Sequence, residues 1–389
     1  MKKWCFLLLF ASLLASCSKS ANGNEGKNVL HAKLEKTEVS LKDLFSKIEV
    51  IPLETNDTAL MDHIHRVREV DGKYYILSEE YPGFSYITTM VFDAEGNFLH
   101  TIGKKGQGPG EYPWLIYDMD IDVKKNLVYM FSPDGKFYLY RLDGSFVRKM
   151  EIQGLFLRAY HNMELLDNNR MLIWSGTDIE NDAMNLLDTD SATFVKGLWK
   201  DYFEMNWAVS GDFCHKYQGK TYFTPAVERK VYELDADSLR VAYEWDFGKD
   251  NYDASEARSN LKGLDHVDAR NQWNEMRRSG NVPYTILNQG QMDKYHFAYF
   301  LGRYDGEDTV PNENRFTLFY EKATGKSYYF NQTVEGLAIR PCLIKEDAMY
   351  QLIPTEDLET LLPVLDDSEK EKVRKRIEDD NPCLVKFIP

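Results

Sequence analysis

A repeated unit of four short strands is the feature that most constrains the fold of this chain. In the first copy, HIHRVREV (63–70) is followed by KYYILSE (73–79), YITTMVFD (86–93) and, after a tight turn, NFLHTI (97–102). Alternating apolar and polar residues between Asp-Gly or Glu-Gly turns are typical of antiparallel hairpins. The unit recurs along the chain and predicts an all-β fold, a β-propeller with six blades.

The two ends of the repeat array complete one another. The last unit contains three strands, LAIRPCLI, AMYQLIP and NPCLVKFIP, whereas KIEVIPLE (47–54) stands alone ahead of the first unit. Pairing the lone strand with the last three fills the sixth blade and hides the sheet edges that an open array would expose. We therefore predict a six-bladed propeller closed by its N-terminal strand.

Two stretches break the strand pattern. Residues from about 250 to 280 and from about 366 to 380 lack alternation and have a helical composition. They predict helical insertions in blades five and six. A chain of this length usually divides into domains, but repeat folds are the exception. We assign residues 29–389 to a single propeller domain.

The stretch TIGKKGQGPGEYPW (101–114) contains a run of glycines of the kind found in phosphate-binding loops. A dinucleotide fingerprint needs glycine where Glu111 stands, and a P-loop needs lysine after glycine, where Pro109 stands. Both motifs also precede a helix, whereas the sequence that follows here has a strand pattern. We interpret the stretch as a structural loop between two blades, formed by Gly106, Gly108, Pro109 and Gly110.

Three motifs resemble a known family. IEVIPLET, FDAEGNFLHTIGKKGQGPGEY and the terminal DDNPCLVKF are together similar to six-bladed β-propeller lipoproteins of unknown function from gut-type Gram-negative bacteria. The glycine-containing motif also resembles an NHL-like or TolB-like propeller repeat. The resemblance covers most of the mature chain and is strongest at residues 51–55 and 106–112. It implies a fold and an exported location, and it carries over no activity, substrate or catalytic residue.

The N-terminus has the features of a lipoprotein signal. Two lysines precede an apolar stretch that is too short to span a bilayer, and the motif LASC ends at Cys17. We predict a signal peptide over residues 1–16, lipidation of Cys17 and a flexible polar tether over residues 17–28. Ser18 favours the outer membrane, and the lack of an early acidic cluster favours the periplasmic side over the cell surface. An ordinary secretory signal with an incidental cysteine is the alternative.

The charge balance argues against nucleic acid as a partner. The formal net charge is -15 at pH 7, and no basic stripe stands out in the sequence. Besides Cys5 and the lipidated Cys17, the chain contains Cys214, Cys342 and Cys383, which lack the paired spacing of a zinc site. The sequence leaves open whether two of them pair in an oxidising compartment. We predict no cofactor, with calcium as the one candidate metal.

The candidate site residues lie on inner strands, because the first strand of each blade lines the central channel. Asp118 and Asp120 alternate along the inner strand of the second blade and share one face. They are either part of a calcium site completed by other blades or the acidic lining of a hydrated channel, and we favour the lining. His65 and His161 lie in the first and third blades and are candidate metal ligands, although structural histidines are the preferred interpretation.

Aromatic side chains offer a second kind of binding group. Trp114 and Trp273 are candidates for stacking on a sugar ring, although strand aromatics pack between blades more often than they face a ligand. Cys214 and His215 have the chemistry of a nucleophile and its base. Neighbouring strand residues point to opposite faces, however, so we expect no catalytic pair.

Two functional hypotheses follow. The first is an exported, lipid-anchored propeller that binds a glycan, a peptide or an envelope protein without catalysis. The second is a metal-assisted hydrolase or lyase with its site at the mouth of the central channel. The two hypotheses differ in whether carboxylates and other ligands from at least three inner strands converge on one point.

Overall fold

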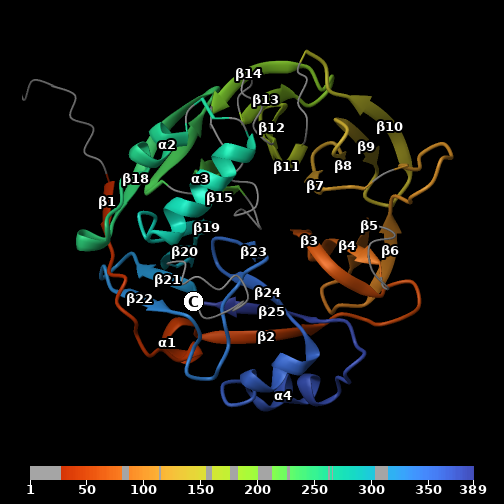
Figure 1. The fold of residues 1–389 in the computed structure, drawn as a ribbon. Helices are drawn as coiled ribbons and strands as arrows, with labels where there is room; N and C mark the ends of the chain where they lie inside the picture. Colours follow the sequence, from red (N-terminus) through yellow and green to blue (C-terminus); the bar gives the residue numbers. More distant parts are fainter. Residues whose placement is uncertain are drawn as a thin grey trace, which may run out of the picture.

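The described residues form six sheets arranged as blades around a central axis (Figure 1). The structure is a computed structural model. It describes residues 28–80, 87–113, 115–154, 160–175, 183–199, 213–225, 228–261, 263–264, 266–302 and 314–389. The all-β, six-bladed propeller predicted from the sequence is confirmed.

Each blade is built from four strands that follow one another from the axis outward, except that the outermost strand of blade 6 comes from the N-terminal part of the chain. Blade 1 contains β3 (Met61–Val70), β4 (Lys73–Glu80), β5 (Ile87–Phe92) and β6 (Phe98–Ile102). Blade 2 contains β7 (Asp118–Asp122), β8 (Leu127–Ser132), β9 (Lys136–Tyr140) and β10 (Phe146–Glu151). Blade 3 contains β11 (Tyr160–Leu166), β12 (Arg170–Ser175), β13 (Met184–Asp188) and β14 (Phe194–Trp199). Blade 4 contains β15 (Cys214–Tyr217), β16 (Lys220–Phe223), β17 (Lys230–Asp235) and β18 (Ser238–Asp246). Blade 5 contains β19 (Thr285–Gln291), β20 (Tyr295–Leu301), β21 (Arg315–Glu321) and β22 (Ser327–Phe330). Blade 6 contains β23 (Leu343–Ile344), β24 (Met349–Ile353), β25 (Cys383–Ile388) and β2 (Lys47–Pro52).

The turn between the first and second strands recurs from blade to blade with the same backbone conformation. Asp71, Asn126 and Asn169 have φ values of 50°, 55° and 57°, and Gly219 has a φ of 70°. Asn, Asp and Gly tolerate this left-handed region better than other residues do. The repeated Gly or Asn in the sequence therefore marks the tight turn at the inner end of each of these blades.

Ring closure joins the two ends of the domain in blade 6. Strand β2 pairs antiparallel with β25, and the register places Ile48 opposite Phe387 and Ile51 opposite Leu384. The Val50 side chain of β2 is fully buried. The predicted closure by the N-terminal strand is confirmed.

Helix α4 (Asp367–Arg374) covers the outer edge of β2. The Val50 N–H donates to the Glu369 carboxylate at 2.5 Å, and the Lys372 ammonium donates to the Val50 carbonyl at 2.9 Å. An uncovered strand edge is a template for pairing with other chains. The helix predicted near residues 366–380 therefore blocks the edge that ring closure leaves open.

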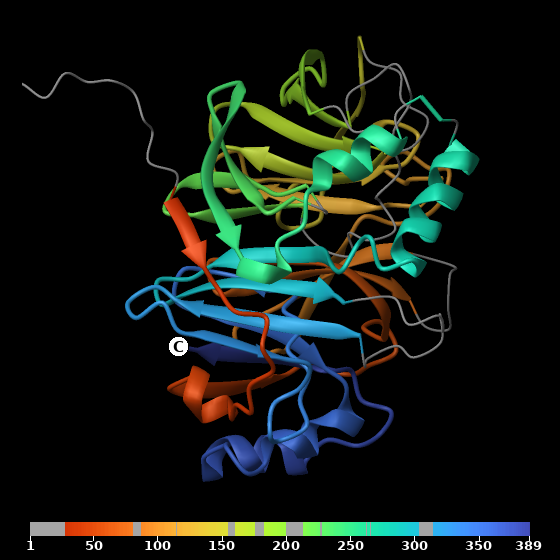
Figure 2. The same ribbon diagram turned by 60° about the vertical axis from the view of Figure 1, so that its left-hand side comes forward.

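An additional strand, β1 (Asn28–His31), lies parallel to β18 on the outer edge of blade 4 (Figure 2). The chain then passes blade 5, where the Thr37 hydroxyl donates to the Tyr329 carbonyl at 3.0 Å. It reaches blade 6, where the Ser46 N–H donates to the Ile388 carbonyl at 2.7 Å. This segment thus fastens the outer edges of three successive blades. Sequence periodicity did not reveal β1, because four residues contain too little alternation.

The hydrophobic core lies between the blades rather than on the axis. Between blades 5 and 6, Phe297 and Phe319 belong to one cluster of buried side chains with Ile339 and Phe387. Each of the other junctions between neighbouring blades has a cluster of the same kind. The two faces of each sheet are therefore apolar, and polar side chains gather on the inner strands around the axis.

Two helices, α2 (Ala254–Leu261) and α3 (His266–Arg278), connect blade 4 to blade 5. They lie together on one face of the ring (Figures 1 and 2). They form the helical insertion predicted near residues 250–280. No helix within the described ranges is long and apolar enough to cross a membrane. The remaining short helices are α1 (Leu41–Leu44), η1 (Gly248–Asp250) and η2 (Thr355–Leu361).

The glycine-rich loop lies between β6 and β7, where the chain passes from blade 1 to blade 2. The Gly108 N–H donates to the Glu111 carboxylate at 2.9 Å, and a Cβ added at Gly106 would lie 1.9 Å from a carboxylate oxygen of Glu111. Gly110 has a φ of +79°, and its carbonyl accepts the Tyr140 hydroxyl at 2.9 Å. The interior of the loop is therefore filled by its own glutamate, where a phosphate-binding loop would leave room for the phosphate.

Candidate functional site

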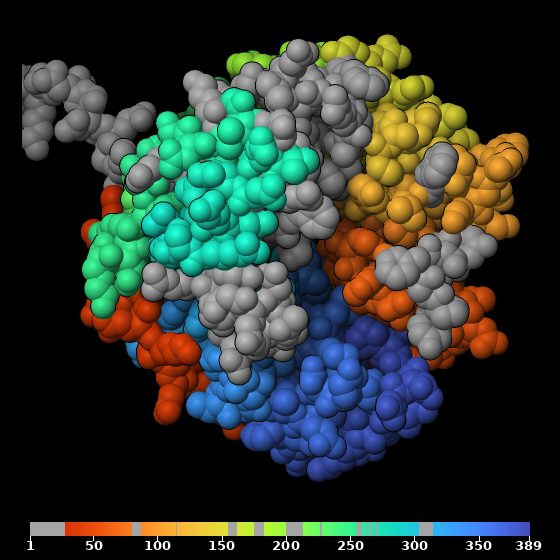
Figure 3. Space-filling model, in the orientation of Figure 1, coloured from red at the N-terminus to blue at the C-terminus, as the bar shows by residue number. Residues whose placement is uncertain are grey.

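The inner strands enclose a central cavity of about 1070 Å³. Its lining includes side chains from β3, β7, β11, β15, β19 and β23, one inner strand from each blade. The space-filling view shows the ring hollowed near its centre, beside blade 1 in orange and blade 6 in blue (Figure 3). The volume is at the upper end of the range that small-molecule sites occupy.

Buried charged side chains of blades 1 and 2 begin one wall of this cavity. Arg66 of β3 binds the Asp118 carboxylate of β7 through two hydrogen bonds, one of them 2.6 Å from Nε to Oδ1. The two side chains are 2% and 1% exposed. Asp118 also accepts the Met163 N–H of β11 at 2.6 Å, and Arg66 donates to the Met163 carbonyl at 3.1 Å. The ion pair therefore joins the inner strands of three blades.

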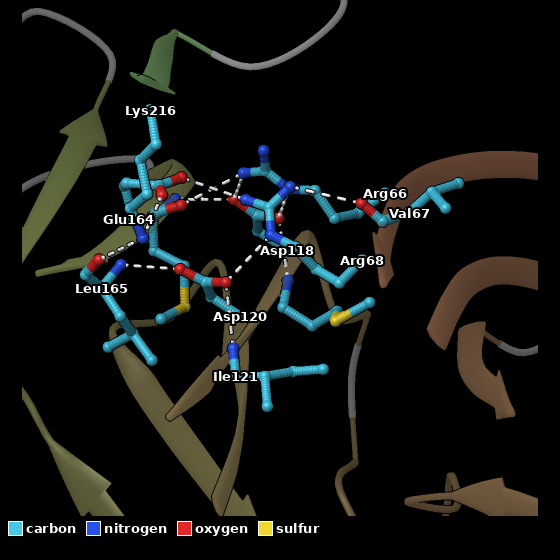
Figure 4. A network of polar contacts seen from close by, with 11 residues as sticks. Arg66, Val67, Arg68, Asp118, Asp120, Ile121, Glu164, Leu165 and Lys216 are labelled. Carbon is cyan, nitrogen blue, oxygen red and sulfur yellow. Dashed lines mark hydrogen bonds and ion pairs between the residues drawn. The ribbon is translucent and has the colours of Figure 1, made fainter. Parts of the chain in front are cut away.

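A second layer of charges lies two residues further along the same strands (Figure 4). Arg68 donates to Asp120 at 2.9 Å and to Glu164 of β11 at 3.0 Å. Asp120 accepts the Leu165 N–H at 2.7 Å, and the Lys216 ammonium of β15 lies 2.8 Å from the Glu164 carboxylate. The cations of β3 and β15 thus flank the carboxylates of β7 and β11. We call Arg66, Arg68, Asp118, Asp120, Glu164 and Lys216 the charged network.

The charged network holds Asp120 and Lys216 in their ionised forms. Burial opposes ionisation of Asp120, but the positive charges of Arg68 and Lys216 outweigh it and lower the pKa of Asp120 to about 2. Burial also opposes protonation of Lys216, yet Glu164 and Asp120 raise the pKa of Lys216 above its ordinary value. Groups with such pKa values exchange few protons near neutral pH, so this wall is poorly suited to general acid–base catalysis.

The wall formed by blades 5 and 6 has a different character. Tyr299 and Gln289 line the cavity and are 8% and 5% exposed. Among the residues that the structure describes, the Tyr299 hydroxyl and the Gln289 Nε2 have no hydrogen-bond partner. Arg315 and Arg340 line the same wall. We call Gln289, Tyr299, Arg315 and Arg340 the donor wall. Buried polar groups are normally paired, so the Tyr299 hydroxyl and the Gln289 Nε2 indicate where water or a ligand completes the hydrogen bonding of this wall.

The turns that follow the inner strands of blades 4, 5 and 6 contact one another at one end of the cavity. The Gln218 N–H donates to the Glu346 carboxylate at 2.7 Å, and the Asp293 N–H donates to the Glu346 carbonyl, also at 2.7 Å. Asp293 accepts the Tyr217 hydroxyl at 3.2 Å. Asp347, next to Glu346, lines the cavity as well. We call Asp293, Glu346 and Asp347 the acidic mouth.

Comparison with known families gives a match over almost the entire described chain. The model of a domain of unknown function, DUF4934, matches residues 28–387. The chain belongs to the DUF4934 family. No curated protein sequence matches it.

Two solved structures from Bacteroides share the fold of this DUF4934 protein. A Bacteroides fragilis protein whose description proposes that it is exported superimposes with a TM-score of 0.71 at 17% sequence identity, over 93% of this chain and 100% of that one. A member of the DUF4221 family from Bacteroides vulgatus gives a TM-score of 0.52 at 11% identity, over 91% of this chain and 99% of that one. At such low identities these likenesses establish the propeller fold and leave the ligand to be inferred from the site.

The residues singled out from the sequence have different surroundings in this DUF4934 protein. His65 and Asp120 line the cavity, and the His65 Nε2 lies 3.2 Å from the Glu79 carboxylate. Trp273 of α3 is 8% exposed, so little of its ring is available for stacking on a ligand. Trp114 and the side chain of His161 lie outside the residues that the structure describes.

Asp118 and Asp120 bind arginine side chains and are not available to a metal ion or to water. Asp118 and Asp120 are 1% and 4% exposed, and their oxygens accept hydrogen bonds from Arg66 and Arg68 and from backbone amides. A calcium ion needs six or more oxygen ligands, so it would have to displace both arginines. Within the described ranges, no three His, Cys, Asp or Glu side chains are grouped to hold a metal. The hydrated acidic lining favoured from the sequence is likewise replaced by a buried, neutralised network.

The cysteines and His215 show no sign of nucleophilic activation. Cys214, Cys342 and Cys383 are free thiols. Burial raises the pKa of Cys342 to about 12 and that of Cys383 to about 11, which disfavours the reactive thiolate. The His215 ring stacks on Tyr222 with centroids 5.1 Å apart, and burial lowers the pKa of His215 to about 3.

Sequence reasoning missed the arginines of the charged network and all of the donor wall. The spacing R-x-R in HIHRVREV and D-x-D in YDMDIDV could have indicated the network, because it places two cations and two carboxylates at matching positions on adjacent inner strands. No comparable signal marked Tyr299 and Arg315. They come from the second and third strands of a blade, where side chains usually pack against the neighbouring sheet.

Proposed function

We propose that this DUF4934 protein is an exported, lipid-anchored propeller that binds a small polar ligand in its central cavity without catalysis. The observation that carries the proposal is the donor wall, with the buried Tyr299 hydroxyl and Gln289 Nε2 lacking partners. Leaving such groups unpaired costs about 1–3 kcal/mol each. A ligand with matching acceptors recovers this free energy on binding.

A binding role fits the chemistry of the cavity better than a hydrolase or lyase does. The carboxylates best placed for catalysis, Asp120 and Glu164, are neutralised by Arg68 and Lys216. A general acid or base works best with a pKa near the operating pH, and the pKa of Asp120 is about 2. The alternative of metal-assisted hydrolysis would require dismantling this network.

Screening the full mature protein by thermal unfolding tests the proposal. Neutral and acidic oligosaccharides and short peptides are added at millimolar concentrations, and we expect at least one class to raise the unfolding temperature in a saturable manner. Each stabilising compound is then recovered and analysed by mass spectrometry, and we expect it to be unchanged. Turnover of the compound would contradict the non-catalytic role, and the absence of any stabilising compound would contradict binding in the cavity.

Membrane attachment rests on the sequence motif that ends at Cys17 and is tested separately. The description of the Bacteroides fragilis structural relative proposes export for that protein, which supports the same location here. We expect metabolic labelling with a radioactive fatty acid to mark the wild-type protein and not the Cys17→Ala variant. Protease added to intact cells then distinguishes the periplasmic side, which we favour, from the cell surface. Equal labelling of both proteins would contradict the anchor.

A further inference from the structure

We propose that the donor wall is a carboxylate-binding subsite, in which Arg315, Tyr299 and Arg340 hold the carboxylate of a small ligand. The inference rests on the proposed function and specifies the chemistry of its ligand. The carboxylate comes from an acidic sugar or from the C-terminus of a short peptide. These two sources present the same group to the protein and are separated by the experiment below.

The three side chains line the cavity at the junction of blades 5 and 6. Thr317 of β21 faces blade 6, since its hydroxyl donates to the Ile339 carbonyl at 3.1 Å. Arg315 lies two residues before Thr317 and therefore has the same face, and Tyr299 of β20 lies opposite Thr317 in the register. Arg340 directly follows Ile339. All three line the one cavity.

The subsite offers hydrogen-bond donors in excess of acceptors. The Tyr299 hydroxyl is buried without a partner, and within the described chain the Arg315 side chain forms no ion pair or hydrogen bond. The cavity carboxylates lie at other positions: Asp120 and Glu164 in the charged network, Glu69 beside Lys345, and Asp293, Glu346 and Asp347 in the acidic mouth. The Arg315 guanidinium and the Tyr299 hydroxyl are therefore available to bind an anion from outside the protein.

The charge distribution along the axis also orients the ligand, with its carboxylate toward the arginines and away from the acidic mouth. Arg315 begins β21 and Arg340 precedes β23, so both lie at the end of the cavity away from the turns that form the acidic mouth. A bound carboxylate is attracted to the arginines and repelled by the acidic mouth. The planar guanidinium matches the two oxygens of a carboxylate and can bind it through paired hydrogen bonds.

Two matched pairs of probes test the inference by calorimetry on the full mature protein. One pair is a disaccharide that contains glucuronic acid and the same disaccharide with glucose in its place. The other pair is a tripeptide with a free C-terminus and the same peptide as its C-terminal amide. We expect the acid of at least one pair to bind at least about tenfold more tightly than its neutral partner. The pair that shows the difference identifies the source of the carboxylate.

Substitutions test whether the subsite causes the preference for the acid probe over its neutral partner. We expect Arg315→Gln to remove the tenfold preference and Tyr299→Phe to reduce it, whereas Arg374→Gln on the exposed face of α4 leaves it unchanged. Equal binding of the acid and neutral partners in both pairs overturns the subsite and leaves binding in the cavity intact. A preference that persists in Arg315→Gln also overturns it. Absence of binding by all four probes overturns the subsite, and failure of the wider screen in addition overturns the proposed function.

Discussion

The two walls of the central cavity contain similar side chains in opposite states. On the wall of blades 1 to 4, Arg66 is buried, Arg68 is 13% exposed, and both bind carboxylates of other blades. On the donor wall, Tyr299 lacks a partner and Arg315 has no carboxylate beside it in the described chain. An arginine that faces a propeller axis therefore has a role set by its neighbours. An arginine bound to a carboxylate of another blade stabilises the ring. An arginine without such a carboxylate is available to a ligand.

The largest expected effect comes from breaking the charged network at its most buried pair. We expect Asp118→Ala to lower the free energy of unfolding by about 3–5 kcal/mol, because it leaves the Arg66 guanidinium buried without its carboxylate. Urea denaturation measures the loss. Asp167→Ala, at a side chain that is 85% exposed, is the matched control and should change the free energy by less than about 0.5 kcal/mol. A similar value for both variants would show that the network does not hold the blades together.

A smaller effect is expected from titrating the same wall. The pKa of Asp120 is about 2 in the folded protein and about 3.9 in an unfolded chain, so its ionised form stabilises the fold above about pH 4. This stabilisation, about 2–3 kcal/mol, is lost as the pH falls from about 5 to about 2. We expect Asp120→Asn to be less stable than the wild type at neutral pH and to lose less on acidification. Parallel stability curves for the two proteins between pH 5 and pH 2 would contradict the pKa assignment.

The smallest effect on stability should come from the donor wall. Tyr299→Phe removes a buried hydroxyl that has no partner and leaves the ring in place. We expect the free energy of unfolding without ligand to stay within about 1 kcal/mol of the wild type or to increase, since no hydrogen bond is lost. Calorimetric unfolding of the ligand-free protein measures it. A loss as large as that of Asp118→Ala would mean that the hydroxyl is paired within the fold.

The fold was accessible from the sequence because it depends on local patterns that repeat. The alternation in KIEVIPLE, together with a last unit one strand short, predicted the pairing of β2 with β25 that the structure shows. The structure adds that Asn126, Asn169 and Gly219 form recurring turns with positive φ. The four residues of β1 escaped detection, because they form a strand only by pairing in parallel with the distant β18.

The roles of the site residues were harder to predict from the sequence, because they depend on contacts between blades. Asp118 and Asp120 were singled out correctly as inner-strand residues, but their partners Arg66 and Arg68 come from another blade. Whether a carboxylate binds a cation, water or an arginine depends on which side chains the closed ring brings beside it. From the sequence, a tyrosine in a strand such as Tyr299 is expected to pack against a neighbouring sheet. The structure shows that, among the described residues, its hydroxyl has no partner.

The division of roles between the two walls is tested by placing the same substitution on each wall. Arg66→Gln and Arg315→Gln are compared by their unfolding temperatures and by their affinity for the carboxylate probe that binds the wild type. We predict that Arg66→Gln lowers the unfolding temperature by at least about 5 °C, whereas Arg315→Gln stays within about 1 °C and loses at least about tenfold in affinity. Equal losses of unfolding temperature in the two variants, with affinity retained by Arg315→Gln, would contradict the division of roles between the walls.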